Sequence, residues 1–248
     1  MTKTILKLCL ALAVTGLAGC KVVSHTSMFV SDIVDAMEDP SKPMYVATDY
    51  RFEVSSSTAC QANVGKSHEI LARYFADVED VKCARDGIRD FVQFSTKSPM
   101  IFGQKANGSA LPGNLVAGYG VTKLPEEKLA LYTLLHRQRV DVMMSEFKQV
   151  FRAPGTVNIE LYGVSVTLQN DLNGPIEIGG PASFINDEPQ LVTSAKIDRR
   201  GKLKFTLTLR RRRSRGTAWH SCSFSRPIDG YAAQAAPSVT LVSPNFNY

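Results

Sequence analysis

The 248-residue sequence contains none of the short motifs that mark the common hydrolase, nucleotide-binding and metalloprotease sites. It has no G-x-S-x-G nucleophile elbow, no glycine-rich loop to hold a phosphate, and no H-E-x-x-H pair. Its 4 histidines form no ligand pattern, and His220-Ser221-Cys222 lacks the further ligands that a zinc site needs. We therefore expect that the protein is not an enzyme, that it has no catalytic residues, and that it binds no metal or cofactor.

The sequence also lacks a second long apolar run. Beyond residue 19 no stretch reaches the roughly 20 apolar residues that a membrane-spanning helix needs. The charge excess is small, because the formal net charge is +6 and Lys3 and Lys7 supply part of it. Charge therefore favours contact with anionic envelope surfaces only weakly. The composition, 44% hydrophobic and 21% charged, is that of an ordinary globular protein.

The N-terminus carries the clearest signal in the sequence. Lys3 and Lys7 precede an apolar run from Leu8 to Leu17, and small residues follow, which is the layout of a secretory signal peptide. The segment Leu17-Ala18-Gly19-Cys20 resembles the lipobox of bacterial lipoproteins. The alternative is a plain signal peptide in which this cysteine is accidental.

The lipobox resemblance implies a lipid anchor on Cys20. In such lipoproteins the signal peptide, here residues 1–19, is removed, a diacylglycerol is attached to the cysteine sulfur, and the new N-terminus is acylated, with palmitate as the expected chain. Two or three acyl chains anchor a protein stably, whereas one does so marginally. Lys21 follows the cysteine in place of Asp, which by the enteric-type sorting rule implies the outer membrane of the cell envelope.

Three of the five cysteines remain after Cys9 leaves with the signal peptide and Cys20 takes the lipid. Export implies an oxidising compartment, where paired cysteines form disulfides. We favour a Cys60–Cys83 bond because these residues bracket one predicted helix. That helix is about 21 Å long, so the chain must double back for the sulfurs to meet. Pairing of Cys222 with either residue is the alternative.

The chain divides into an anchor, a tether and a folded part. We interpret residues 20–43 as the lipidated N-terminus and tether, with two possible helical turns at 29–37. Residues 44–248 are interpreted as a single envelope domain with possible halves 44–122 and 123–248.

Periodicity predicts the elements of the first half. Alternating apolar residues predict a strand at 45–54. Helical spacing predicts a helix at about 64–78 with Asn63 as its N-cap. Further strands are predicted at 91–96 and 115–121.

The second half repeats this order. A strand is predicted at 129–135, a helix at about 139–151, and a strand at 157–168 with a β-bulge at Gly163. A hairpin pairs 191–197 with 202–209. The order strand–helix–strand therefore occurs twice, which predicts an α+β fold with a mostly antiparallel sheet and a C-terminal hairpin.

This layout is loosely similar to lipoproteins of unknown function carried by phages and prophages. The similarity rests on the lipobox, the short tether, and Cys60 before and Cys83 after the first helix.

The most visible polar feature is the run of Arg210, Arg211, Arg212, Arg213 and Arg215. It suits anionic lipid headgroups, lipopolysaccharide phosphates or an acidic protein patch. Nucleic acid is the usual partner of such a run, but export argues against it. The simpler interpretation, which we favour, is a solvated strand end. Four acids, Glu79, Asp80, Asp86 and Asp90, are similarly interpreted as a solvated surface.

Three functions are compatible with these features. The first is a membrane-anchored lipoprotein that binds another envelope component, a protein or a glycan, without catalysing a reaction. The second is a structural or assembly lipoprotein that contacts peptidoglycan or a secretion complex. The third is an enzyme acting on envelope polymers, which a buried pair of carboxylates in a cleft would support. We expect the first.

Overall fold

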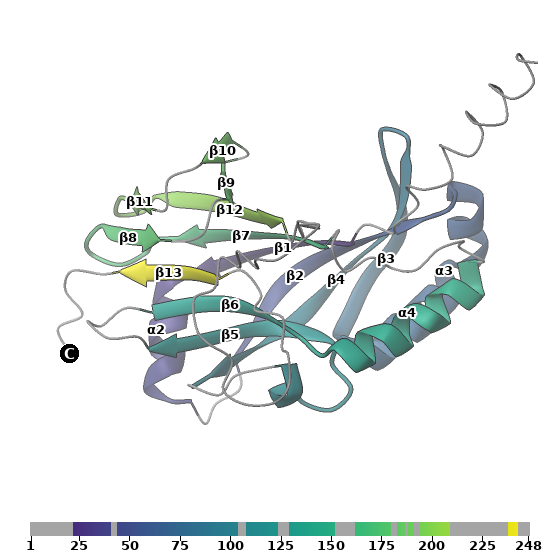
Figure 1. Ribbon diagram of the computed structural model, residues 1–248, viewed down its shortest axis with the longest axis horizontal. Coiled ribbons are helices and arrows are strands. Elements are labelled where there is room, and N and C mark those ends of the chain that lie inside the picture. The colour runs from purple at the N-terminus through teal and green to yellow at the C-terminus, as the bar shows by residue number, and fades with distance from the viewer. Residues whose placement is uncertain are drawn as a thin grey trace, which may run out of the picture.

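The computed structural model describes residues 22–40, 44–103, 108–123, 129–151, 162–179, 183–186, 188–190, 194–208 and 238–242. Within these ranges the chain forms a large curled β-sheet with helices against it (Figure 1). The α+β fold and the mostly antiparallel sheet predicted from the sequence are confirmed.

The described elements have the bounds β1 Val22–Phe29, α2 Val30–Glu38, β2 Met44–Val54, α3 Ser57–Tyr74, β3 Ala76–Asp86, β4 Arg89–Phe102, a short 3-10 turn Gly108–Ala110, β5 Ala117–Lys123, β6 Leu129–Leu135, α4 Arg137–Phe151, β7 Tyr162–Gln169, β8 Ile176–Gly179, β9 Ser183–Ile185, β10 Glu188–Gln190, β11 Ser194–Ile197, β12 Lys202–Thr208 and β13 Ser238–Val242. The sheet has the strand order β10-β9-β12-β7-β1-β2-β4-β5-β6-β13-β8-β11, with β3 paired to β4 off this path. The pairs β1–β7 and β4–β5 are parallel, and the other pairs are antiparallel.

Strand β2 shows why the sequence forms this sheet. Its residues alternate between the core and the solvent, as the sequence predicts. On its buried side Tyr50 and Phe52 join Phe94 of β4, Phe75 and Phe147 in one aromatic cluster with ring centroids 4.9–6.3 Å apart. Each fully buried Phe side chain contributes about 2–3 kcal/mol of stability, so this cluster is a main part of the core.

Two helices lie side by side against this region (Figure 1). In α4, Met143, Phe147 and Phe151 are buried, on the apolar stripe that the sequence predicts. Next to the buried Phe147, the Glu146 carboxylate accepts a hydrogen bond from Tyr74 of α3 at Oε1 (2.7 Å) and forms an ion pair with Arg73. The two predicted strand–helix–strand halves thus share one core.

The predicted tether is wrong at residues 22–29, whereas the helical turns predicted at 29–37 are confirmed. Residues 22–29 form β1, which lies between β2 and β7 inside the sheet, and residues 30–38 form α2. The error arises because the buried face of β1 includes Ser24 and Thr26, which look like linker residues but are 1% exposed. Thr26 Oγ1 donates a hydrogen bond to Ala47 O (2.6 Å), which makes burial of its hydroxyl tolerable.

Helix α3 is shifted toward the N-terminus relative to the helix predicted at about 64–78. It begins at Ser57 and ends at Tyr74. Ser56 is the N-cap, and its Oγ accepts a hydrogen bond from Ala59 N (3.1 Å). Asn63 lies inside the helix, where its Nδ2 donates to Ala59 O (2.9 Å). The acidic stretch after the helix forms edge strand β3, whose register shifts twice against β4.

The predicted C-terminal hairpin has the right turn but the wrong partners. A turn at 198–201 joins β11 to β12, yet β11 pairs with β8, and β12 pairs with β7 and β9. Alternation alone does not identify a strand's neighbour. Strand β7 is described from Tyr162, and its ladder with β1 runs through Gly163 without the predicted bulge. The first part of that predicted strand lies outside the described residues.

Candidate functional site

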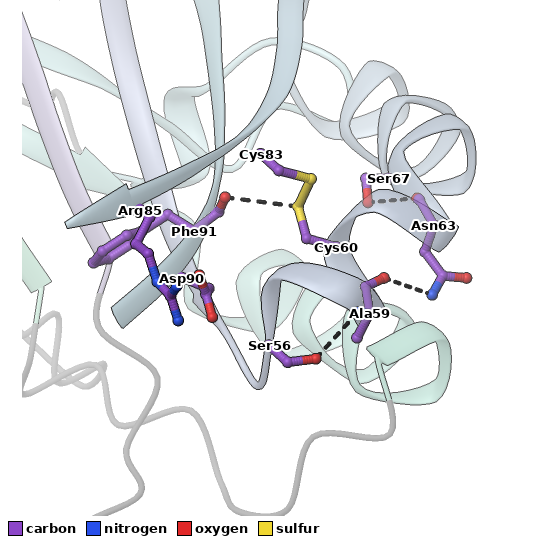
Figure 2. Close-up of a disulfide and its surroundings, with 9 residues drawn as sticks. All are labelled: Ser56, Ala59, Cys60, Asn63, Ser67, Cys83, Arg85, Asp90 and Phe91. Carbon is purple, nitrogen blue, oxygen red and sulfur yellow. Dashed lines mark hydrogen bonds and ion pairs between the residues drawn. A yellow bond between two sulfur atoms is a disulfide. The ribbon is translucent and has the colours of Figure 1, made fainter. Parts of the chain in front are cut away.

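The structure brings together two of the residues singled out from the sequence. Cys60 and Cys83 form a disulfide with a Cα–Cα distance of 5.9 Å (Figure 2). Lipidation residue Cys20, alternative disulfide partner Cys222 and the arginine run lie outside the described residues.

The disulfide joins the first turn of α3 to edge strand β3. Cys60 is fully buried, and its Sγ lies 3.7 Å from the carbonyl oxygen of Phe91 on β4. Cys83 lies opposite Val92 in the β3–β4 ladder. The chain doubles back after α3, so a bond between residues on either side of most of the helix is geometrically satisfied. The bond therefore attaches the β3–β4 hairpin to α3, at a point close to the closed end of the hairpin.

That hairpin closes in a two-residue turn, Gly87-Ile88. Asp86 pairs with Arg89 across it. Gly87 has φ +59°, and Ile88 is not among the positive-φ residues, which is the pattern of a type II′ turn with glycine first. Ile88 is 94% exposed. The turn itself does not favour an isoleucine, because turn positions prefer Gly, Asn, Asp and Ser.

Arginines and acids alternate around this turn. Arg51 Nη1 lies 3.7 Å from Asp86 Oδ2, and Arg89 Nε lies 3.8 Å from Glu53 Oε1. Arg85 Nε lies 3.3 Å from Asp90 Oδ1, and this oxygen accepts no hydrogen bond from the described residues (Figure 2). The more exposed of these pairs, Arg51–Asp86 and Arg89–Glu53, contribute at most about 1 kcal/mol each. Their main consequence is that the hairpin end carries little net charge.

The closed end of the hairpin lies at the end of the sheet where the described chain begins. Val22 lies opposite Phe52, Phe52 opposite Val92, and Val92 opposite Cys83. The N-terminal end of β1 therefore lies toward the same end of the sheet as the turn that contains Ile88. We call this part of the molecule, defined by Val22, Arg51, Glu53 and residues 83–92, the hairpin end.

The acids considered for catalysis do not form a buried pair. Asp90 is the one buried carboxylate among the residues whose exposure is described, and Asp86, Glu79 and Asp80 are exposed.

Ser165 and Asp49 both lie opposite His25, on the two strands that flank β1. Serine, histidine and aspartate are the residue types of a hydrolase triad. However, the Asp49 carboxylate accepts from Ser95 (2.6 Å), and no hydrogen bond joins His25 to Asp49 or Ser165 in this part of the chain.

The shifted pKa values have structural causes. Burial, followed by the hydrogen bond to Glu146, raises the pKa of Tyr74. Burial alone raises the pKa of Tyr132. The hydrogen bond to Asp77 raises the pKa of Lys97.

Across the described ranges, no three or more His, Cys, Asp or Glu side chains are grouped to hold a metal ion. In these same ranges, no helix is both long and apolar enough to cross a bilayer.

Two polar residues that the sequence did not single out connect distant parts of the fold. Asn170 is fully buried, and its Nδ2 donates to the carbonyl oxygens of Gly174 (2.8 Å) and Ile197 (3.0 Å). The Asp171 carboxylate accepts hydrogen bonds from the backbone N and the Oγ of Ser31 at the start of α2. The turn-forming composition of 170–174 was the signal available in the sequence.

Comparison with known proteins gives a family but no described activity. No curated protein and no solved structure matches the chain. One family model, described as "Domain of unknown function (DUF7424)", matches residues 22–208 and so begins at the first residue of β1. Since this match spans most of the sequence, the chain belongs to the DUF7424 family.

Proposed function

We propose that the protein is a lipoprotein of the bacterial cell envelope, anchored through Cys20 to the outer membrane, whose domain binds another envelope component without catalysing a reaction. The observation that carries this proposal is the lipobox at residues 17–20 directly ahead of the domain. Both β1 and the family match begin at Val22, two residues after Cys20. The domain is thus attached to its anchor with almost no spacer.

The disulfide supports export. A bond between Cys60 and Cys83 forms and persists in an oxidising compartment such as the periplasm. It also stabilises the edge of the sheet nearest the start of β1.

The arginine run follows a strand that ends on the same side of the sheet as the anchor. Thr208, the last residue of β12, lies opposite Gly163, and Gly163 lies opposite Val23. Arg210 is two residues beyond Thr208, so covalent length keeps it within about 7 Å of that point. A basic segment close to a lipid anchor favours contact with anionic headgroups, lipopolysaccharide phosphates or an acidic partner.

Photo-crosslinking in living cells tests the binding role. Photoreactive residues are placed at Arg212 and Trp219, and at Val142 on the exposed side of α4 as a control. One dominant protein adduct from the first two positions, absent from the control, supports a binding role and identifies the partner. Glycan adducts support the polymer-binding form. Equal adducts from all three positions contradict a specific binding surface near the arginine run.

A further inference from the structure

Ile88 is the most exposed large apolar side chain in the described part of the protein. It lies at the outermost point of a hairpin turn that is fixed by the Asp86–Arg89 pair and, further back, by the Cys60–Cys83 disulfide. A single exposed aliphatic residue needs no explanation on a flat surface. At the tip of a fixed hairpin it presents a protruding apolar group.

The position of this tip relative to the anchor can be calculated from the strand register. Val92, in the same cross-strand row as Val22, is four residues from Ile88, so the tip extends about 14 Å beyond that row. The twist between β1 and β2 and between β2 and β4 together rotates β4 by about 45° relative to β1. The component of the 14 Å extension that lies along the direction of β1 is therefore about 10 Å. Cys20 lies two residues before Val22 and reaches at most about 7 Å from it.

Measured along β1, the hairpin tip therefore extends at least as far beyond Val22 as Cys20 can reach. With acyl chains on Cys20 inserted in a bilayer, a domain whose β1 points toward the membrane brings Ile88 to the headgroup region. We propose that the hairpin end is a second membrane contact, in which Ile88 enters the lipid interface and sets the orientation of the domain. This inference rests on the proposed lipid anchor.

The surrounding charges fit a lipid surface. Arg51, Arg85 and Arg89 are each paired with an acid, so no excess negative charge opposes approach to phosphates. Their side chains are 44%, 67% and 51% exposed, which leaves guanidinium nitrogens free to turn toward headgroups. Long basic side chains often lie with their stems along apolar surface and their charges toward phosphate.

Fluorescence of a single tryptophan tests this contact on the full-length acylated protein. The background is Trp219→Phe, which removes the only tryptophan, and the probe is Ile88→Trp. The matched control is Tyr45→Trp, because Tyr45 is an exposed aromatic residue near the other end of β2, opposite Pro99 and therefore about 36 Å from Ile88 along β4. Both proteins are reconstituted into vesicles that contain brominated phospholipids.

We expect the probe at position 88 to show blue-shifted emission and several-fold stronger bromolipid quenching than the control. No quenching at position 88 in a vesicle-bound, acylated protein would overturn the membrane contact and leave the lipoprotein proposal intact. Blue-shifted emission without quenching would show that protein covers the tip, and it would also overturn the contact. An unacylated protein that does not bind vesicles would overturn both proposals.

Hydrogen exchange provides a second measurement with the native tip. Amides of residues 86–89 should exchange several-fold more slowly in the vesicle-bound protein than in the unanchored Cys20→Ala chain, while those near Tyr45 should not differ. Equal exchange at the tip in the two forms would contradict the contact.

Discussion

Val22 lies directly opposite Phe52 in the β1–β2 ladder. The described domain therefore begins in the middle of its own sheet, at the level of its aromatic core. Because Cys20 is only two residues upstream, a lipid on that residue is attached almost directly to a central strand. The proposed anchor would therefore restrict motion of the domain relative to the membrane.

The lipid anchor predicts a specific effect of Cys20→Ala. This variant should remain unacylated and should appear in the soluble fraction, since the contacts that we propose for Ile88 and the arginine run are too weak to hold the domain on a membrane without the lipid. Cys9→Ala is the matched control, because Cys9 lies in the signal segment and should leave anchoring unchanged. Membrane fractionation measures both, and full membrane retention of Cys20→Ala would refute the anchor.

The disulfide should be detectable and should stabilise the fold. Non-reducing peptide mapping should link Cys60 to Cys83. Cys83→Ser should lower the free energy of unfolding by about 3 kcal/mol in denaturant titrations, because the bond restricts the unfolded chain. Cys222→Ser should preserve both the Cys60–Cys83 peptide and the stability. A peptide that links Cys222 to either residue would contradict the pairing.

Asn170→Ala should be strongly destabilising. The substitution removes an amide that is fully buried and leaves carbonyl oxygens, including those of Gly174 and Ile197, without this donor. We expect the free energy of unfolding to fall by about 3 kcal/mol. Asn63→Ala, which removes one partly exposed bond within α3, should cost about 1 kcal/mol or less. Equal effects of the two variants would mean that the Asn170 network does not stabilise the fold.

Asp171 should stabilise α2 in a pH-dependent way. Burial alone would raise the pKa of this carboxyl, but hydrogen bonds from Ser31 outweigh burial and hold the pKa below its usual 3.8. A lowered pKa means that the stabilisation is complete above pH 3.8 and is lost as the pH falls through the folded-state value. Asp171→Ala should therefore cost about 1 kcal/mol at neutral pH.

The pH dependence of stability distinguishes the Asp171–Ser31 hydrogen bonds from a general charge effect. The stability difference between the native protein and Asp171→Ala should be constant above about pH 5 and should shrink only in stronger acid. Asp35→Ala, which removes an exposed acid on the same helix, should not reproduce the loss at neutral pH. A difference between Asp171→Ala and the native protein that increases as the pH falls would contradict the assignment.

The arginine run predicts a salt-dependent contact. Arg211→Glu combined with Arg213→Glu should weaken partner binding or vesicle association, and added salt should weaken the native contact in the same way. The doubly substituted protein should remain acylated and folded. Unchanged localisation and partner binding would show that the run is a solvated segment, which is the simpler interpretation of the sequence.

Side-chain alternation and helical spacing predicted the elements that have clear apolar periodicity. The buried face of β2, strand β6 at 129–135 and the stripe of α4 agree with the structure. Strand β1 was missed because its inward side chains include Ser24 and Thr26, whose hydroxyl burial depends on neighbouring strands. Local sequence does not contain that information.

Pairing and site geometry depended on contacts between distant residues. The partners of β11 and β12 follow from the curl of the whole sheet rather than from the turn that joins them. The position of Ile88 relative to Cys20 likewise required the register of three strands. The resemblance to a lipobox, in contrast, needs no long-range contact to recognise, because it rests on consecutive residues.

The most direct test of the account is the intact mass of the protein extracted from bacterial membranes. We predict a chain that begins at Cys20, without residues 1–19, and carries a diacylglycerol and an additional acyl group. Mild base hydrolysis should remove the ester-linked chains and leave the amide-linked one. A chain that retains residues 1–19, or one that is cleaved elsewhere and carries no lipid, would contradict the anchor and with it the proposed orientation of the domain.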